Sequence, residues 1–302
     1  MQKGEEGLDK AYNDTINRIG NQQQGFRDLA KRVLLWIVWP LTTGELRHAL
    51  AVEPDASSLD MRNLFTLEDM LSSCLGLVTV DKESNIIRLV HYTTQEYFQR
   101  TSLENFPDVQ RDTVAASCLT YLSFDVFAEG DCLTDEILIQ QYPFFDYAAQ
   151  NWAHHFQDTQ QGIEDLALKY LMDDSKTAAS SRVLFQDQDL FQSQRARFCG
   201  LHLVAYFGLK DIMIRLLREK APDAKDDDDR TPLSYAAERG NETVVKLLLD
   251  CNDVDPNSKC VNGWTSLSRA VERGSAAIVQ LLLDRGAEID YNYNIVSQSA
   301  IC

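Results

Sequence analysis

The last third of the chain repeats one sequence unit three times. Equivalent leucines stand at positions 201, 233 and 267, so the unit recurs after 32 and then after 34 residues. The middle copy reads Arg230-Thr-Pro-Leu-Ser-Tyr-Ala-Ala-Glu-Arg-Gly240 and continues through an apolar run that ends at Leu249. A unit of this length cannot bury its apolar face alone, so neighbouring copies must stack, and about three are needed for stability. The repeat therefore predicts a short solenoid.

Each copy carries the signals of two helices joined by a turn. Thr231 can cap the first helix, and Pro232 suits its first position, where no backbone N–H is needed. Gly240 and Gly274 stand where a left-handed residue would end that helix. The positions that we expect to be buried in the middle copy are Leu233, Ala236, Ala237, Val244, Leu247 and Leu248.

The motif Thr-Pro-Leu-x-x-Ala, repeated at a period of about 33 residues, is the signature of the ankyrin repeat. Residues 196–290 accordingly resemble an array of about three ankyrin repeats. The following residues, 291–302, lack the signature and a polar capping helix, which the end of a stack needs. We therefore expect either that this tail frays or that the natural product continues beyond it.

Charge and cysteine content restrict the class of partner and the compartment. The formal net charge is −17, which argues against a nucleic-acid-binding surface and against binding to an anionic membrane, and favours basic partner surfaces. No apolar run approaches the roughly 20 residues that cross a bilayer, and the N-terminus lacks a signal-peptide core. The seven cysteines are odd in number and never form a Cys-x-x-Cys pair, so we expect reduced thiols. These features predict a cytoplasmic protein, with the nucleus as the alternative.

The N-terminal third has the layout of a winged-helix module, in which helices precede a β-hairpin and one more helix. The helix at 42–50 contains few basic side chains and the helix at 66–74 contains none, so we expect no DNA binding. The expected elements are helices over 8–19, 26–38, 42–50 and 66–74, strands over 77–80 and 86–90, and a helix that Thr93 or Thr94 caps and that ends near 101.

Amphipathic patterns continue between this module and the repeats. They predict helices over 106–122, 135–156 and 163–172, with 173–194 as a polar, weakly patterned joint that is still partly helical through Val183-Leu184-Phe185. The aromatic residues of this region are expected in the core: Tyr142, Phe144, Phe145, Tyr147, Trp152 and Phe156. The predicted fold is thus mainly α, with a winged-helix module and its one β-hairpin over 8–104, a helical connector over 105–195, a short ankyrin solenoid over 196–290 and a tail over 291–302.

Several runs also resemble the segment that follows the NACHT ATPase in fungal NOD-like receptors, which contains a GPI-inositol-deacylase-type winged helix. The resemblance is carried by Ala30-Lys-Arg-Val-Leu-Leu-Trp-Ile37, Leu41-Thr-Thr-Gly-Glu-Leu-Arg-His-Ala-Leu-Ala-Val-Glu53, Ile87-Arg-Leu-Val-His-Tyr-Thr-Thr-Gln-Glu-Tyr-Phe98 and Tyr142-Pro-Phe-Phe-Asp-Tyr-Ala-Ala-Gln-Asn-Trp152. Together with the repeats it covers nearly the whole chain. It implies a relay-plus-sensor segment whose ATPase lies outside this sequence.

Catalysis has little support in the residues. Phosphate cradling in a P-loop needs the motif Gly-x-x-x-x-Gly-Lys-[Ser/Thr], which this sequence does not contain. The adjacent residues His154 and His155 do not face one another on a helix and have no third ligand at metal spacing. We therefore predict a chain that is not an enzyme and that has no cofactor or metal of its own.

The resemblance implies one conditional nucleotide contact. In related signalling ATPases a winged-helix histidine between a strand and a helix contacts the β-phosphate of ADP, and His91 occupies the equivalent place. Tyr92 stands where those proteins have an acidic residue. The alternative is that His91 caps or packs locally, and the nucleotide role would require a NACHT domain as a partner.

The function that we predict is recognition of a protein partner, with the winged helix as a relay; the alternative is the regulatory part of a NACHT-type ATP/ADP switch. Ankyrin repeats typically offer their loop tips and one helix face to proteins, and the oligomeric state stays open. Asp226 to Asp229 form an acidic loop tip that is either a solvated turn or a steering patch. Trp264 is expected to be exposed as a binding anchor or to pack on its neighbour. The predicted protein-binding residues are Asp226, Asp227, Asp228, Asp229, Arg230, Tyr235, Glu238, Arg239, Trp264, Arg269, Glu272 and Arg273.

Overall fold

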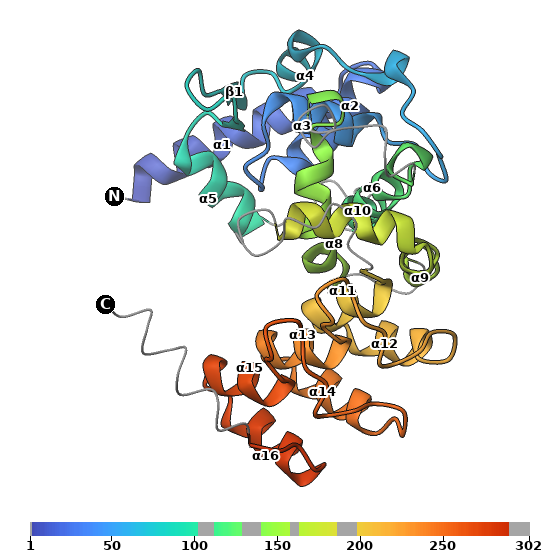
Figure 1. Ribbon diagram of the computed structural model, residues 1–302. Helices are drawn as coiled ribbons and strands as arrows, with labels where there is room; N and C mark the ends of the chain where they lie inside the picture. Colours follow the sequence, from blue (N-terminus) through green and yellow to red (C-terminus); the bar gives the residue numbers. More distant parts are fainter. Residues whose placement is uncertain (1, 102–111, 129–139, 158–162, 186–197, 290–302) are drawn as a thin grey trace. The chain divides into compact units, whose positions relative to one another are not determined.

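The computed structural model describes residues 2–101, 112–128, 140–157, 163–185 and 198–289 (Figure 1). The tail predicted over 291–302 lies outside these ranges. The chain divides into two compact units, one made of Met1–Val126 with Asp131–Gln160 and the other of Phe127–Gly130 with Gln161–Cys302. The predicted connector is thereby shared between the units, because its helices before residue 160 belong to the first and those after it to the second.

The first unit contains the helices and the hairpin that the sequence predicts for a winged helix, followed by two further α-helices. Its elements, in chain order, are α1 (Gln2–Gly20), α2 (Gln24–Trp36), α3 (Thr43–Ala51), the 3-10 helix η1 (Met61–Asn63), α4 (Leu67–Ser73), β1 (Val78–Val80), β2 (Ile87–Leu89), α5 (Tyr92–Thr101), α6 (Asp112–Leu122), the 3-10 turn η3 (Asp125–Phe127) that runs into the second unit, and α8 (Phe144–Gln157).

Local hydrogen bonds define the ends of the winged-helix elements. Thr42 accepts the N–H of Glu45, whose carboxylate accepts the N–H of Thr42, so a capping box opens α3. Thr66 and Asp69 form the same box at α4. Strands β1 and β2 pair antiparallel with Val78 opposite Leu89, and an isolated bridge from Thr42 to Ile86 extends this hairpin toward α3.

Aromatic side chains fill the core of the first unit. Phe144, at the start of α8, packs edge-on against Trp36 of α2 at 5.4 Å and against Tyr121 of α6 at 5.1 Å. Of the six aromatics expected in the core, Phe144, Phe145 and Trp152 are fully buried. The other three, Tyr142, Tyr147 and Phe156, are half-buried.

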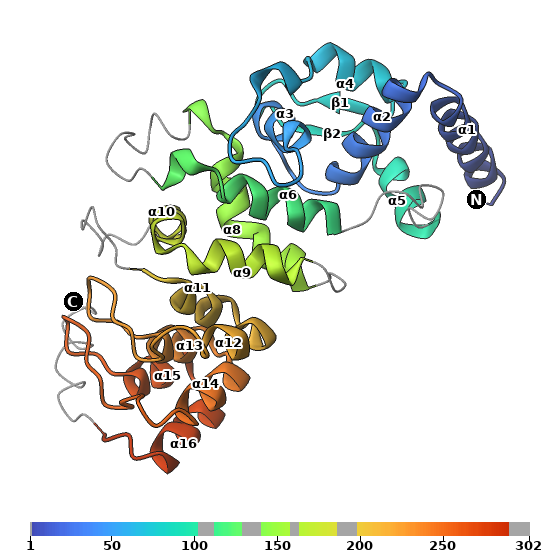
Figure 2. The same cartoon turned by 90° about the vertical axis from the view of Figure 1, so that its right-hand side faces the viewer.

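The second unit is a stack of helix pairs, which both views show from α11 to α16 (Figure 2). Its elements are α9 (Glu164–Met172), α10 (Asp174–Leu184), α11 (Gly200–Phe207), α12 (Lys210–Leu216), α13 (Pro232–Arg239), α14 (Glu242–Leu249), α15 (Ser266–Arg273) and α16 (Ala276–Asp284). The predicted fold class, mainly α with one β-hairpin and a repeat solenoid, is therefore confirmed.

The repeat helices begin and end where the sequence predicts. Thr231 accepts the N–H of Ser234, and Pro232 occupies the first position of α13. Gly240 and Gly274 end α13 and α15 in the left-handed conformation, with φ of 79° and 75°. Five of the six expected core positions are fully buried, but Leu247 is half-buried and Val245 takes its place inside.

The polar joint predicted over 173–194 contains a regular helix, α10, in its described part. The helix is longer than the partly helical stretch expected at 183–185, because the buried face of α10 consists mostly of small hydroxyl residues, which look polar in the sequence. Thr177, Ser180 and Ser181 are buried, and each hydroxyl donates to a carbonyl in the preceding turn. Small side chains let α9 lie close, and Tyr170 of α9 donates its hydroxyl to Ser180 at 2.6 Å.

Candidate protein-binding surface

The acidic loop tip before α13 is organised by Asp226. Its Oδ1 accepts the backbone N–H groups of Asp228 and Arg230 at 3.0 and 2.8 Å, and its Oδ2 accepts the hydroxyl of Tyr235 at 2.7 Å. Asp226 is only 5% exposed, so the prediction that it lies on the open tip is wrong. A carboxylate that accepts three hydrogen bonds in this way stabilises the turn around it. Asp227 and Asp228 are half-buried, which leaves Asp229 as the exposed carboxylate of the run.

Arg230 and Tyr235 were also expected on the surface, and both are buried. The guanidinium of Arg230 lies 3.8 Å from the centre of the Tyr235 ring and forms an ion pair with Glu238. Two further rings, Phe185 and Phe198, pack against Tyr235 with centroids at 5.7 and 5.2 Å. These aromatic residues precede the first repeat helix, so the repeat pattern contains no information about them.

A chain of charged contacts continues from Glu238 into the next repeat. Arg269 lies 3.9 Å from the Glu238 carboxylate and 3.4 Å from that of Glu272. The Arg269 guanidinium also covers the ring of Trp264 at 4.4 Å. Trp264 is consequently half-buried, so of the two predicted alternatives the structure shows packing on a neighbour and not a fully exposed side chain. The structure thus unites seven of the predicted residues: Asp226, Arg230, Tyr235, Glu238, Trp264, Arg269 and Glu272.

Two predicted arginines stand apart from this network. Arg239 and Arg273 are exposed in the last turns of α13 and α15. Arg239 lies over the ring of Tyr206 at 4.3 Å. Tyr206 was missed in the sequence, although it occupies in the first repeat the position that Glu238 and Glu272 occupy in the other two.

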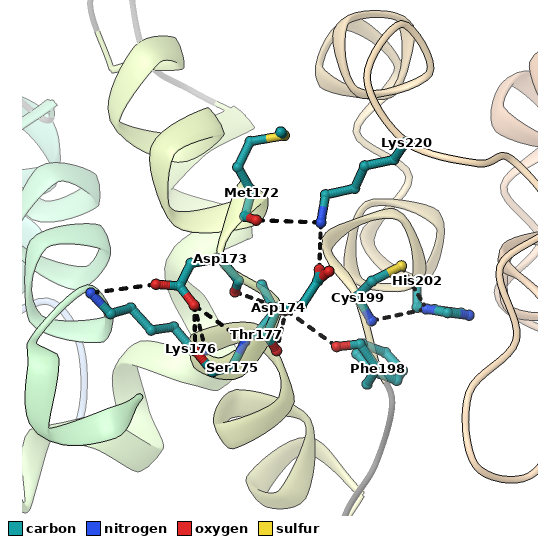
Figure 3. A network of polar contacts seen from close by, with 10 residues as sticks. All are labelled: Met172, Asp173, Asp174, Ser175, Lys176, Thr177, Phe198, Cys199, His202 and Lys220. Atoms are coloured by element: carbon teal, nitrogen blue, oxygen red, sulfur yellow. Dashed lines mark hydrogen bonds and ion pairs between the residues drawn. The ribbon is translucent and has the colours of Figure 1, made fainter. Parts of the chain in front are cut away.

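The first repeat is joined to α9 and α10 by polar contacts (Figure 3). Lys220 donates to the carbonyl of Met172 at 3.4 Å and pairs with Asp174, at the junction of α9 and α10. Buried Thr177 donates its hydroxyl to the carbonyl of Phe198 at 3.2 Å. At Gly200 the carbonyl oxygen of Leu171 would lie 2.1 Å from a Cβ atom. The α9–α10 pair therefore packs on the first repeat as closely as only glycine permits.

A buried histidine connects the first and second repeats. His202 accepts the N–H of Cys199 at Nδ1 over 3.1 Å, so its hydrogen is on Nε2. Nε2 then donates to the carbonyls of Ala224 and Arg230 at 3.1 and 3.2 Å. The residues predicted from the sequence do not include His202, although the ankyrin signature has histidine directly after its leucine, as at Leu201 and His202 here.

His91 caps a helix in the first unit. Its Nδ1 accepts the N–H of Thr93 at 3.3 Å and lies 2.9 Å from the Thr93 hydroxyl. The prediction that Thr93 or Thr94 caps α5 is therefore wrong, because α5 starts at Tyr92 and His91 precedes it. These contacts with Thr93 fit the local-capping alternative for its role, and the imidazole is exposed.

The described ranges contain neither a candidate metal site nor a candidate membrane-spanning helix. His155 packs on Trp39 at 4.6 Å and its Nε2 lies 3.0 Å from the Tyr147 hydroxyl, whereas His154 is exposed. Among the described residues, no three His, Cys, Asp or Glu side chains form a group that could hold a metal ion. The helices in these ranges include none with the length and apolar character of a membrane span.

Comparison with known proteins finds a family match for two separate segments of the chain. Residues 201–293 match the family model of ankyrin repeats in three copies. Residues 18–108 match that of the GPI inositol-deacylase winged helix domain. Azaphilone pigments biosynthesis cluster protein L of Monascus ruber is 28% identical over 184 residues, which cover 53% of this chain and 38% of that relative. The chain thus carries ankyrin repeats and a winged helix domain of this type, and it matches well under half of the length of its fungal relative.

Proposed function

We propose that this chain is a non-catalytic protein-recognition module whose ankyrin repeats bind a protein partner. Ankyrin repeats generally mediate protein–protein interaction. The observation that supports this role is the network from Asp226 through Glu238 to Glu272, which fixes the loop before α13 and links α13 to α15 before a partner arrives. Pre-ordered side chains lose less conformational entropy on binding. Next to this network the exposed Asp229, Arg239 and Arg273 offer charges to a partner.

Co-purification with matched variants tests this proposal. The tagged full chain is expressed in cells, and its co-purifying proteins are quantified by mass spectrometry. Reversal of the exposed charges, with Arg239→Glu and Arg273→Glu, is expected to deplete a defined partner at least about tenfold, because each lost charged contact weakens binding by a factor of about ten or more. The control is Lys246→Glu on α14, where an exposed lysine pairs within its own helix. Equal recovery with all variants would contradict recognition by this face.

Within the same proposal, the winged helix domain relays partner binding to a second protein. The alternative is a regulatory segment of a NACHT-type switch, with the ATPase supplied by a longer product or by another chain. The exposed His91 at the junction of β2 and α5 supports this alternative, because a ring there is accessible to a docked domain.

The mass of the natural protein separates the two versions of the relay. Capture with an antibody against the repeats is followed by intact mass measurement. A mass near 34.3 kDa supports a chain that acts with separate partners. A much larger mass with an ATPase before the winged helix supports the switch, and then His91→Ala is expected to reduce nucleotide retention. Unaltered retention in that variant would remove the role of His91.

A further inference from the structure

Arg239 and Arg273 form a pair of equivalent cations on successive repeats. Each is the last residue of its helix, directly before the left-handed Gly240 or Gly274. Both side chains are exposed. Within the ranges that the structure describes, neither guanidinium has a carboxylate at ion-pair distance. The charged network around Glu238 and Arg269 therefore leaves these two charges available.

The structure orients the first of these arginines. Its guanidinium lies over the Tyr206 ring at 4.3 Å. Tyr206 is itself held by edge-on contacts with Phe185 and Phe207, at 5.3 and 5.0 Å. A guanidinium stacked on a ring keeps its N–H groups at the edge, where they can bind a carboxylate in a bidentate manner.

The second arginine repeats this placement one unit later. The Nε of Arg273 lies 3.8 Å from the point where a Cβ on Gly240 would stand. Like Arg239, it thus leans on the helix end of the preceding repeat. A distance of 3.8 Å is an ordinary van der Waals contact, so the Arg273 side chain lies directly against the end of α13.

Nearby carboxylates do not neutralise the pair, because they are engaged elsewhere. Glu238 is shared by Arg230 and Arg269, and Glu272 also pairs with Arg269. Among the described residues, both carboxylates therefore form their ion pairs with Arg230 or Arg269, and not with Arg239 or Arg273.

We propose that Arg239 and Arg273 bind two carboxylates of an acidic polypeptide segment in the partner. This inference rests on the proposed recognition function and names the chemistry of the partner. Packed helices lie about 8–10 Å apart, and an extended chain advances about 3.3 Å per residue. Acidic side chains two or three positions apart in the segment match that spacing. The net charge of −17 opposes such a partner only at long range, because physiological salt screens charges beyond about 8 Å.

Peptide selection on the full chain tests the inference directly, because it needs no isolated partner. The probe is a phage-displayed library of random peptides, panned on the immobilised protein. We expect enriched sequences with two Asp or Glu residues two or three positions apart. Synthetic versions are expected to bind the double variant Arg239→Gln, Arg273→Gln about ten- to a hundredfold more weakly, since each lost charge-assisted contact is large.

Two further variants give the experiment its controls. Arg239→Lys with Arg273→Lys keeps the charge but removes the bidentate geometry, so binding is expected to fall between the wild type and the glutamine variant. Arg218→Gln removes an exposed charge elsewhere on the same repeat stack and is expected to change nothing. Circular dichroism melts verify that every variant is folded.

Each contrary result has a definite meaning. Enriched peptides that are basic or apolar would overturn the acidic assignment and leave protein recognition in place. Acidic peptides that bind the glutamine variant as tightly as the wild type would overturn the assignment to these two arginines. Absence of any enrichment would also overturn the inference, and the co-purification experiment would then decide independently whether the repeats recognise a protein at all.

Discussion

Tyr235 donates its hydroxyl to Oδ2 of Asp226 at 2.7 Å, and this bond fastens the helix α13 to the loop that leads into it. Burial raises the pKa of Tyr235, so the hydroxyl keeps its proton and remains a donor. Asp226 at the same time accepts two N–H groups of its own loop. Both residues therefore support the proposed recognition surface from beneath it.

The substitution Tyr235→Phe is expected to destabilise the repeat unit by about 1–3 kcal/mol, because a buried carboxylate oxygen loses its partner. Urea unfolding followed by circular dichroism measures this change. Tyr92→Phe is the matched control, because Tyr92 is 66% exposed, and it is expected to shift stability by less than about 0.5 kcal/mol. Equal stability of the two variants would show that the bond to Asp226 contributes nothing.

The substitution Gly200→Ala is expected to loosen α9 and α10 from the first repeat. The new methyl group would stand 2.1 Å from the Leu171 carbonyl oxygen, so one backbone must move. Overpacking of this kind costs about 1–3 kcal/mol. Hydrogen exchange should show reduced protection in α9 and at the start of α11.

Gly25→Ala serves as its control, since nothing lies within 4 Å of a Cβ there and the position is in helix α2. This change is expected to be neutral or slightly stabilising. A Gly200→Ala protein with wild-type stability and exchange would contradict the close packing of α9 on α11.

The burial of His48 predicts that the stability of the first unit depends on pH. Burial, with a smaller contribution from Arg47, lowers the pKa of His48 to about 4. The unfolded chain has a histidine pKa near about 6.5, so protonation favours unfolding. The contribution of neutral His48 to the free energy of unfolding is therefore fully present above about pH 6.5. The free energy of unfolding falls by up to about 3 kcal/mol between about pH 6.5 and pH 4.

The variant His48→Asn isolates this contribution. Asparagine can still accept the Tyr121 hydroxyl, which lies 2.8 Å from His48 Nδ1. The difference in unfolding free energy between the wild type and the variant should therefore shrink as the pH falls from about 7 to about 4.5. A difference that stays constant over this range would show that His48 does not titrate as its burial requires.

The hydrogen bonds of Asn241 predict that the stabilities of the first two repeats are coupled. Its Nδ2 donates to the carbonyls of Ala205 and Tyr206 at 2.8 and 3.0 Å, which satisfies the C-terminal end of α11. Asn241→Ala is expected to cost about 1–2 kcal/mol and to broaden the unfolding transition, because repeat stability depends on nearest-neighbour contacts. The exposed Asn262→Ala is the control, and an unchanged transition in both proteins would argue against this coupling.

The sequence by itself determined the local architecture. Cap and turn signals act within a few residues. The start and end of α13 could therefore be predicted from Thr231, Pro232 and Gly240 without knowledge of where the helix lies in the molecule. The winged-helix hairpin was predictable for the same reason, since two β-rich runs flank a polar turn. The mainly helical fold with stacked repeats follows from these local patterns and is confirmed.

Only the tertiary structure decided which side chains remain available to a partner. Asp226 and Tyr235 look like surface residues in the repeat pattern, but Asp226 accepts the hydroxyl of Tyr235, and Tyr235 packs against Phe185 and Phe198. Helix α10 was predicted only in part, because its buried face carries hydroxyl side chains that look polar in the sequence. Burial depends on contacts between segments far apart in the sequence, and local periodicity carries no information about those contacts.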